Sequence, residues 1–243
     1  MAIRCLFGLA KRWADILAQK WKNSSLNGEK PRVCVSIAPK NATQFEELLK
    51  EANLSQAHLI ELRVDGLVGD AQSFVQAFLR NIPSKPLVLT YNLEKPVTLG
   101  GTKDGLHVFF ELARYASYLD APDEITQKVK HSAKRIASLH FSRSINFEEG
   151  IKAIDDLAKN HDVVKLVFLA EKLEDNYTAL KLASSTEIPR IIFCMGELGF
   201  LSRFLAPFCG CVWTYASLKR GTRTAAGQVD VDTLIKMYQT LLR

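Results

Sequence analysis

A lysine lies inside one of the most apolar stretches of this 243-residue chain. Seven of the eight residues from 163 to 170 are apolar, and the eighth is Lys165. A short run rich in β-branched residues is typical of a strand that is buried on both faces, as in a parallel sheet covered by helices. Because an ammonium group is costly to bury, such a lysine either pairs with an acid or loses its proton. A neutral lysine in a dry pocket is a nucleophile that forms a Schiff base with a ketone.

The alternative interpretation gives this lysine no chemistry. Lys165 would then lie at the end of the strand, with its stem packed and its ammonium group in water. Successive side chains of a strand point to opposite faces, so Val163, Lys165 and Val167 share one face. The neighbouring strands must therefore decide whether that face is a pocket.

Strand-like and helix-like segments alternate from residue 32 onward. Strands are predicted at residues 32–37, 59–64, 87–91, 118–121, 135–140, 163–169, 190–195 and 211–216. Helices are predicted at residues 44–52, 71–81, 106–117, 147–160, 177–184 and 231–242, the last with Asp230 as its N-cap. This alternation in about 210 residues favours a (β/α)8 TIM barrel, with a doubly wound open sheet as the alternative. No glycine-rich dinucleotide motif or P-loop occurs, so nucleotide binding has no support.

Polar residues end several of these strands, where barrel enzymes hold their chemistry. Ser36 closes the first strand, and Glu61 and Arg63 close the second on a shared face. Glu61 and Arg63 form either an internal ion pair or a pair of groups that bind substrate hydroxyls. His140 ends the strand before that of Lys165, and its ordinary pKa of about 6.5 suits proton transfer beside an imine.

Two further segments offer groups that bind anions and hydroxyls. Arg203 follows the seventh strand, and a guanidinium clamps a carboxylate through two parallel hydrogen bonds. Thr224 and Gln228 lie in a loop after the eighth strand and offer a hydroxyl and an amide. Together these groups predict a polar, anionic ligand.

These segments, taken in order, resemble the type I 3-dehydroquinate dehydratases, Schiff-base enzymes of the shikimate pathway and of chorismate and aromatic amino acid biosynthesis. The resemblance spans residues 31–241. The segments that carry it are Ser36, Glu61-Leu62-Arg63-Val64-Asp65, Ser138-Leu139-His140, Val164-Lys165, Met195-Gly196 through Ser202-Arg203, Thr214-Tyr215 and Thr224-Ala225-Ala226-Gly227-Gln228. The Met-Gly to Ser-Arg segment is the most specific of them.

The resemblance implies a lyase that dehydrates 3-dehydroquinate to 3-dehydroshikimate on a (β/α)8 barrel. Lys165, in its uncharged form, would attack the ketone and form the imine. His140 would be the general acid and base. The resemblance also implies the substrate-binding residues, which are Ser36, Glu61, Arg63, Arg203, Thr224 and Gln228. No metal and no organic cofactor is expected, because the lysine polarises the substrate.

The chain departs from the family pattern at two places that matter for rate. The arginine that usually ends the third strand is Asn92 here. The glutamate that orients the catalytic histidine is absent from its usual place, and Glu94 and Asp120 are the candidates to replace it. Two alternative functions therefore stay open. One is another Schiff-base barrel enzyme such as an aldolase, and the other is a non-catalytic descendant that binds a ligand.

The composition limits the kinds of binding partner and the cellular compartment that we expect. Residues 1–32 carry seven Lys/Arg against two Asp/Glu, and the rest carry 25 against 24, so no basic stripe predicts nucleic-acid binding. No apolar stretch reaches 18 residues, so no transmembrane helix is expected. Five cysteines without a C-x-x-C pair indicate buried thiols in a cytoplasmic protein and no metal site.

The first 30 residues are expected to form a separate extension before a catalytic barrel at 31–243. Residues 2–22 have apolar side chains at three- and four-residue steps, which is typical of an amphipathic helix, and residues 23–28 read as a linker. The helix could dock on its own barrel or on a second subunit of a homodimer. Binding to a membrane surface is the less favoured alternative.

Overall fold

The protein is described by a computed structural model, which places residues 30–92, 103–130, 132–219 and 227–242. The predicted extension at 1–30 lies almost wholly outside these residues and stays a prediction. Among the described residues, no helix is long and apolar enough to cross a membrane.

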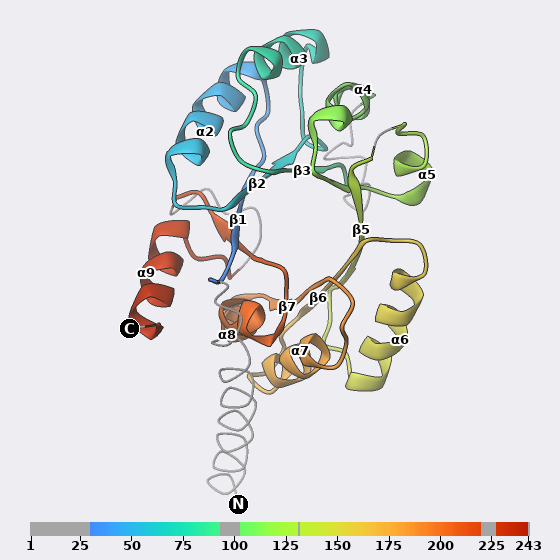
Figure 1. Ribbon diagram of the computed structural model, residues 1–243, viewed down its shortest axis with the longest axis vertical. Helices are drawn as coiled ribbons and strands as arrows, with labels where there is room; N and C mark the ends of the chain where they lie inside the picture. The colour runs from blue at the N-terminus through green and yellow to red at the C-terminus, as the bar shows by residue number, and fades with distance from the viewer. Residues whose placement is uncertain (1–29, 93–102, 131, 220–226, 243) are drawn as a thin grey trace, which may run out of the picture.

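Eight parallel strands form a nearly closed barrel, with the helices outside it (Figure 1). The strands are β1 Val33–Ile37, β2 Leu59–Arg63, β3 Leu87–Thr90, β4 Tyr118–Asp120, β5 Lys134–Phe141, β6 Val163–Leu169, β7 Arg190–Met195 and β8 Thr214–Ser217. Their order is β7-β6-β5-β4-β3-β2-β1-β8, so each strand lies beside its neighbour in sequence and β8 returns to β1. This order confirms the predicted TIM barrel and excludes the doubly wound sheet.

Helices connect the strands. The α-helices are α2 Ala42–Leu54, α3 Ala71–Arg80, α4 Lys103–Leu112, α5 Asp123–Thr126, α6 Phe147–Ala158, α7 Asp175–Ser184, α8 Phe200–Leu205 and α9 Val231–Leu241. Short 3-10 turns are η2 Ala113–Tyr115, η3 Glu197–Gly199 and η4 Ala206–Cys209. The side chain of Asp230 accepts from the backbone N–H of Thr233, which confirms the predicted N-cap of α9.

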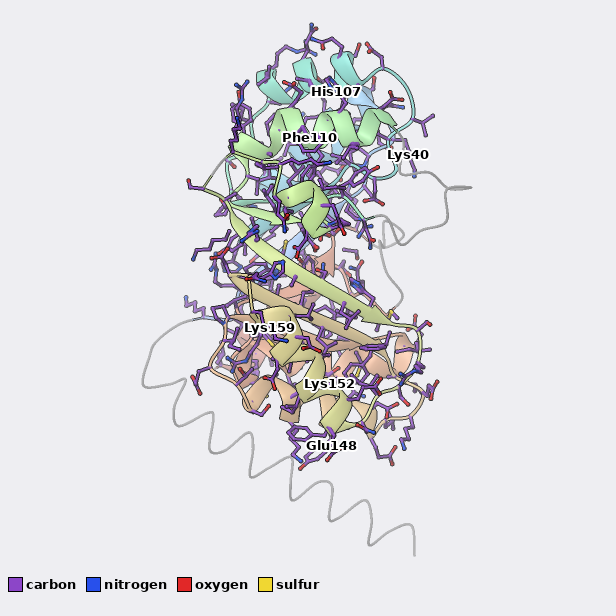
Figure 2. The ribbon with its side chains drawn as sticks, turned by 90° about the vertical axis from the view of Figure 1, so that its right-hand side faces the viewer. Lys40, His107, Phe110, Glu148, Lys152 and Lys159 are labelled. Atoms are coloured by element: carbon purple, nitrogen blue, oxygen red, sulfur yellow. The ribbon has the colours of Figure 1, made fainter. Side chains whose placement is uncertain are left out.

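Helix α6 shows how the helices cover the barrel. Gly150 and Ile154 are the buried residues of this helix, and Gly150 lies against Leu182 of α7. The charged residues Glu148, Lys152 and Lys159 lie on the exposed side of the helix or at its end (Figure 2). This division of apolar and charged faces is what a helix lying on a sheet requires.

Strand β4 pairs with only the first part of β5. Strand β4 has only three residues, and its pairing with β5 stops at Asp120 and Ile136. Strand β5 continues to Phe141, paired with β6 through six residue pairs. The part of β5 that carries Ser138 and His140 therefore lies beyond the end of β4, which leaves room beside it for a cavity.

One element was misplaced by the sequence-based prediction, and two short helices were missed. The eighth strand was predicted at 211–216, but β8 is Thr214–Ser217, because residues 209–213 turn the chain toward β7 first. A hydrogen bond of 2.9 Å from Val212 N to Arg190 O joins that turn to β7. Helices α5 and α8 were not predicted, since each has six residues or fewer and shows little periodicity.

Candidate active site

Lys165 lies inside the barrel, where it contacts groups from several strands. Its side chain is buried, with 6% of the residue exposed. Its Nζ donates to Asp120 Oδ2 at 2.8 Å and lies 3.6 Å from Glu61 Oε1. The same nitrogen lies 4.8 Å from the centre of the Tyr215 ring. The alternative in which this ammonium group reaches solvent is wrong.

The buried lysine is paired rather than neutral. Burial alone would lower the pKa of Lys165, but the carboxylates of Asp120 and Glu61 outweigh it, so the pKa is raised above its ordinary value. This corrects the expectation of an uncharged amine in the free protein. The sequence could not show the pairing, since Asp120 is 45 residues away along the chain.

Asp120 is held by two hydrogen bonds. Its Oδ2 accepts from Lys165, and its Oδ1 accepts from Ser138 Oγ at 2.7 Å. Burial would raise the pKa of Asp120, but the positive charge of Lys165 and these hydrogen bonds lower it below its ordinary value. The charges of Asp120 and His140 also act on each other, and the role of Asp120 in orienting His140 stays a prediction.

Glu61, the second carboxylate near Lys165, is held by two hydroxyl groups. Ser36 Oγ donates to Glu61 Oε2, and Thr90 Oγ1 donates to Glu61 Oε1 at 3.1 Å. Arg63 pairs instead with Asp65, at 3.1 Å between Nη2 and Oδ2. Of the two alternatives considered for Glu61 and Arg63, the internal ion pair is therefore not the one that the structure shows. Thr90 was missed from the sequence, although its place at the end of β3, next to β2, was a usable signal.

His140 follows Ser138 by two residues and therefore shares its face of β5. Burial, together with the positive charge of Lys165, lowers the pKa of His140 to about 4, against a partial opposing effect of Asp120. The imidazole is consequently neutral at neutral pH and able to accept a proton. Glu94, the other candidate to orient it, lies outside the described residues.

A cavity of about 280 Å³ opens onto these groups. Its wall includes Lys165, Asp120, Ser138 and His140 from β4 to β6. On the β2 and β3 side it is lined by Arg63, Thr90, Tyr91 and Asn92. Leu157, His161 and Asp123 of the α5 and α6 region complete it, and His161 Nε2 lies 2.6 Å from Asp123 Oδ1. No local sequence pattern singled out this second histidine.

Arg203 lies on α8, where local hydrogen bonds position it. Ser202 accepts from the backbone N–H of Cys194 at 2.9 Å, and its own N–H donates to Asn176 Oδ1 at 2.8 Å. Thr214 Oγ1 donates to Arg203 O at 2.8 Å. These contacts attach α8 to β7, α7 and β8. They explain why a serine precedes Arg203 in the Ser-Arg motif.

The guanidinium of Arg203 is buried without an acidic partner among the residues described. Its Cζ lies 4.3 Å from the centre of the Phe193 ring, and 3% of the residue is exposed. Nε has no hydrogen-bond partner in the described part of the chain. Burial lowers the pKa of Arg203 to about 10. A buried cation in this state is a site for an anion.

Gln228 is buried next to the turn that precedes α8. Gly227 has φ +74°, and a Cβ at this position would lie 2.2 Å from Gly196 O. The loop carrying Gln228 therefore packs directly on the Met-Gly turn, which only glycine allows at this distance. Thr224 of the same loop lies outside the described residues. No group of three or more His, Cys, Asp or Glu side chains that could hold a metal occurs in the described segments.

Comparison with known proteins identifies relatives over most of the chain. The sequence model of the type I 3-dehydroquinase family matches residues 33–242. A 3-dehydroquinate dehydratase of Methanothermobacter thermautotrophicus is 29% identical over 219 residues, which cover 87% of this chain and 97% of the relative. One from Methanocella arvoryzae is 28% identical over 224 residues, with 87% and 97% covered.

Solved structures agree on the fold. The type I 3-dehydroquinate dehydratase of Clostridium difficile superposes with a TM-score of 0.72 at 22% identity, covering 87% of this chain and 92% of that one. The enzyme of Aquifex aeolicus gives a TM-score of 0.69 at 23% identity, with 86% and 98% covered. At such identities these structures support the barrel alone.

Proposed function

The chain belongs to the type I 3-dehydroquinase family, and on that premise we propose that it dehydrates 3-dehydroquinate to 3-dehydroshikimate through an imine on Lys165. The observation that carries the proposal is the buried Lys165, paired at 2.8 Å with Asp120 and sharing one cavity with His140. The family model matches residues 33–242, which supports the proposal that residues 1–30 are an extension before a catalytic barrel at 31–243.

Lys165 supplies the covalent step. As a free amine its nitrogen attacks the ketone at C3 of the substrate and forms an imine with loss of water. Once protonated, the imine withdraws electrons from the neighbouring carbon and makes the C2 proton acidic. The chemistry needs neither a metal ion nor an organic cofactor.

His140 moves the proton. Its lowered pKa, about 4, supports the role of general base, because the imidazole is neutral before it takes the C2 proton. The imidazolium formed then donates that proton to the C1 hydroxyl as it leaves as water. Loss of this hydroxyl gives the conjugated product, which water releases from the lysine.

Arg203, Gln228, Thr224 and Ser36 form the proposed pocket for the substrate carboxylate. Arg203 carries the binding energy, since an anion would supply the partner that its buried guanidinium lacks among the described residues. Glu61 and Arg63 hold the ring hydroxyls. Asn92 lines the cavity onto which Lys165 and His140 open, whereas Arg203, Gln228 and Ser36 are not among the residues that line it. Asn92 offers an amide where the family has an arginine.

A direct assay tests the proposed function. The protein is incubated with 3-dehydroquinate, and 3-dehydroshikimate is followed through the ultraviolet absorbance of its conjugated enone. We expect turnover without added metal and in the presence of a chelator. No product at any enzyme concentration, with a folded protein, would contradict the proposal. An aldol cleavage product instead would point to another Schiff-base lyase.

A further inference from the structure

Imine formation on Lys165 meets a difficulty in this structure, because the lysine is paired with carboxylates. Nζ lies 2.8 Å from Asp120 Oδ2 in a site that is closed to solvent on most sides. An ammonium group has no lone pair, so Lys165 must lose a proton before it attacks a ketone. The group that accepts this proton must lie within hydrogen-bonding distance of Nζ.

We infer that Asp120 is a further catalytic residue, which carries protons between the Lys165 nitrogen and the substrate ketone oxygen during imine formation. The inference rests on the proposed function, since it concerns the first step of that reaction. It assigns Asp120 a different role from the one considered for it from the sequence, which was to orient His140.

The geometry favours Asp120 over the other carboxylate near the lysine. Glu61 Oε1 is 3.6 Å from Nζ, beyond a hydrogen bond, and both of its oxygens already accept from Ser36 and Thr90. In Asp120, Oδ2 accepts from Lys165, and Oδ1 accepts from Ser138. Asp120 is thus oriented with one oxygen toward the nitrogen that reacts.

The proton balance closes with this single carrier. Asp120 takes one proton from the ammonium group, and the neutral amine then forms its bond to the carbonyl carbon. The electron pair of the C=O bond moves to oxygen, which takes the proton from Asp120. Asp120 then takes a second proton from the nitrogen and gives it to the hydroxyl group, which leaves as water.

Three N–H bonds thereby become one, and the two protons leave with the ketone oxygen. Asp120 ends as a carboxylate beside the protonated imine, as it began beside the ammonium group. The same carboxylate therefore stabilises the positive charge on nitrogen before and after the step. No oxidant or other reactant enters.

The test compares Asp120→Asn with the matched variant Asp175→Asn. Both replace a buried aspartate, but Asp175 accepts from the backbone N–H groups of Glu171 and Lys172 and does not contact Lys165. The measured quantity is the rate at which borohydride traps a 3-dehydroquinate adduct on the Lys165 peptide, by rapid quench and mass spectrometry. We expect adduct formation to be slower by about 100-fold or more in Asp120→Asn. In Asp175→Asn the rate should change by no more than about twofold.

A second readout separates catalysis from a structural defect. Turnover is measured with substrate carrying deuterium at C2, whose removal follows imine formation. In Asp120→Asn the early step becomes limiting, so the isotope effect should fall to about 1, below the wild-type value. An adduct rate equal to wild type, or an isotope effect as large as wild type in a slowed variant, would overturn the assignment.

The experiment distinguishes failure of the proposed function from failure of the role of Asp120. If the wild-type protein traps no adduct, the proposed function itself is wrong. If wild type traps the adduct and Asp120→Asn forms it equally fast, only the role of Asp120 is wrong. Should Asp120→Asn not fold, Asp120→Glu is measured in its place. Its carboxylate is displaced by one methylene, and we expect about 10-fold slower adduct formation; an unchanged rate would overturn the role.

Discussion

Two of the buried cations in the described part of this barrel, Lys165 and Arg203, have different surroundings. Lys165 on β6 has Asp120 at 2.8 Å and Glu61 at 3.6 Å, so its charge is balanced within the protein. Arg203 on α8 is equally buried but has an aromatic ring beside it and no acidic partner among the described residues. The first arrangement suits a group that exchanges protons, and the second suits a group that awaits an anion.

The difference also appears in the direction of the two pKa shifts. Carboxylates raise the pKa of Lys165 despite its burial, whereas burial lowers that of Arg203 to about 10. Removing the lysine should therefore leave carboxylates unpaired, while removing the arginine should relieve an uncompensated charge. A substitution at Lys165 should therefore lower both activity and stability, whereas a substitution at Arg203 should weaken substrate binding without lowering stability.

Lys165→Met is expected to have the largest effect. Because no other amine would replace the nucleophile, turnover should fall by about 10⁴-fold or more. The steady-state dehydration assay measures this, with Lys152→Met as the control, since Lys152 is exposed on α6. Retained activity in Lys165→Met would remove the imine from the mechanism.

The same variant should fold but be less stable. Loss of one partner of a buried pair costs about 3–5 kcal/mol, because Asp120 keeps its burial without its cation. Its pKa in the folded variant then rises above the unfolded value near 4, so the folded state binds a proton that the unfolded chain releases. The stability deficit should therefore grow as pH rises above about 4. Urea titrations at several pH values measure it, and a pH-independent deficit would argue against the pairing.

His140→Ala should separate imine formation from turnover. Without the general base, turnover is expected to fall by about 10²–10⁴-fold, while borohydride still traps an adduct on Lys165. Loss of the adduct as well as of turnover would mean that His140 acts before the proton transfer. The comparison between Lys165→Met and His140→Ala then separates nucleophile from base.

Arg203→Met tests the second cation. Loss of a charged hydrogen bond of about 1.5–3 kcal/mol to the substrate carboxylate should raise KM about 10- to 100-fold. The free protein should lose no stability, because an unpaired charge has been replaced by an apolar chain. Tm and KM are measured together.

Arg190→Met is the matched control for Arg203→Met. Arg190 is also buried, but its guanidinium donates to the carbonyl oxygens of Ala183, Ile188 and Cys209. Its removal should lower Tm and leave KM unchanged. If Arg203→Met instead behaves like this control, Arg203 supports the fold and does not bind the carboxylate.

The smallest expected effect is that of pH on the wild-type protein. His140 faces Lys165, Asp120, Arg63 and Glu61, and its pKa is lowered to about 4. The base stays neutral above that pH, so kcat/KM should change by less than about twofold from pH 8 to 5 and then fall about tenfold per unit below pH 4. A decline centred near 6.5 would mean that His140 titrates as an ordinary histidine.

The sequence predicted the barrel and most of its lining for physical reasons. The alternation of apolar runs and amphipathic segments predicts eight strands, and the two-residue period predicts that Val163, Lys165 and Val167 share one face of the sixth. Burial of Lys165 and the N-cap at Asp230 follow from local patterns and are confirmed.

Contacts that depend on how strands are staggered could not be read from the chain. The pair of Lys165 with Asp120 depends on the register of three strands, in which Asp120 lies opposite Ile136 and Lys165 lies opposite Ser138, and no local pattern reports that register. The helix that carries Arg203 is six residues long, too short for a periodic signal. The sequence therefore indicated Lys165, His140 and Arg63, which line the cavity, but not how their charges are balanced.

Borohydride trapping in the wild-type protein tests the central claim most directly. The protein is mixed with 3-dehydroquinate, reduced, digested and analysed by mass spectrometry. We predict a substrate- or product-sized adduct on the peptide that contains Lys165 and on no other lysine peptide. Turnover of 3-dehydroquinate with no adduct on that peptide would contradict the account.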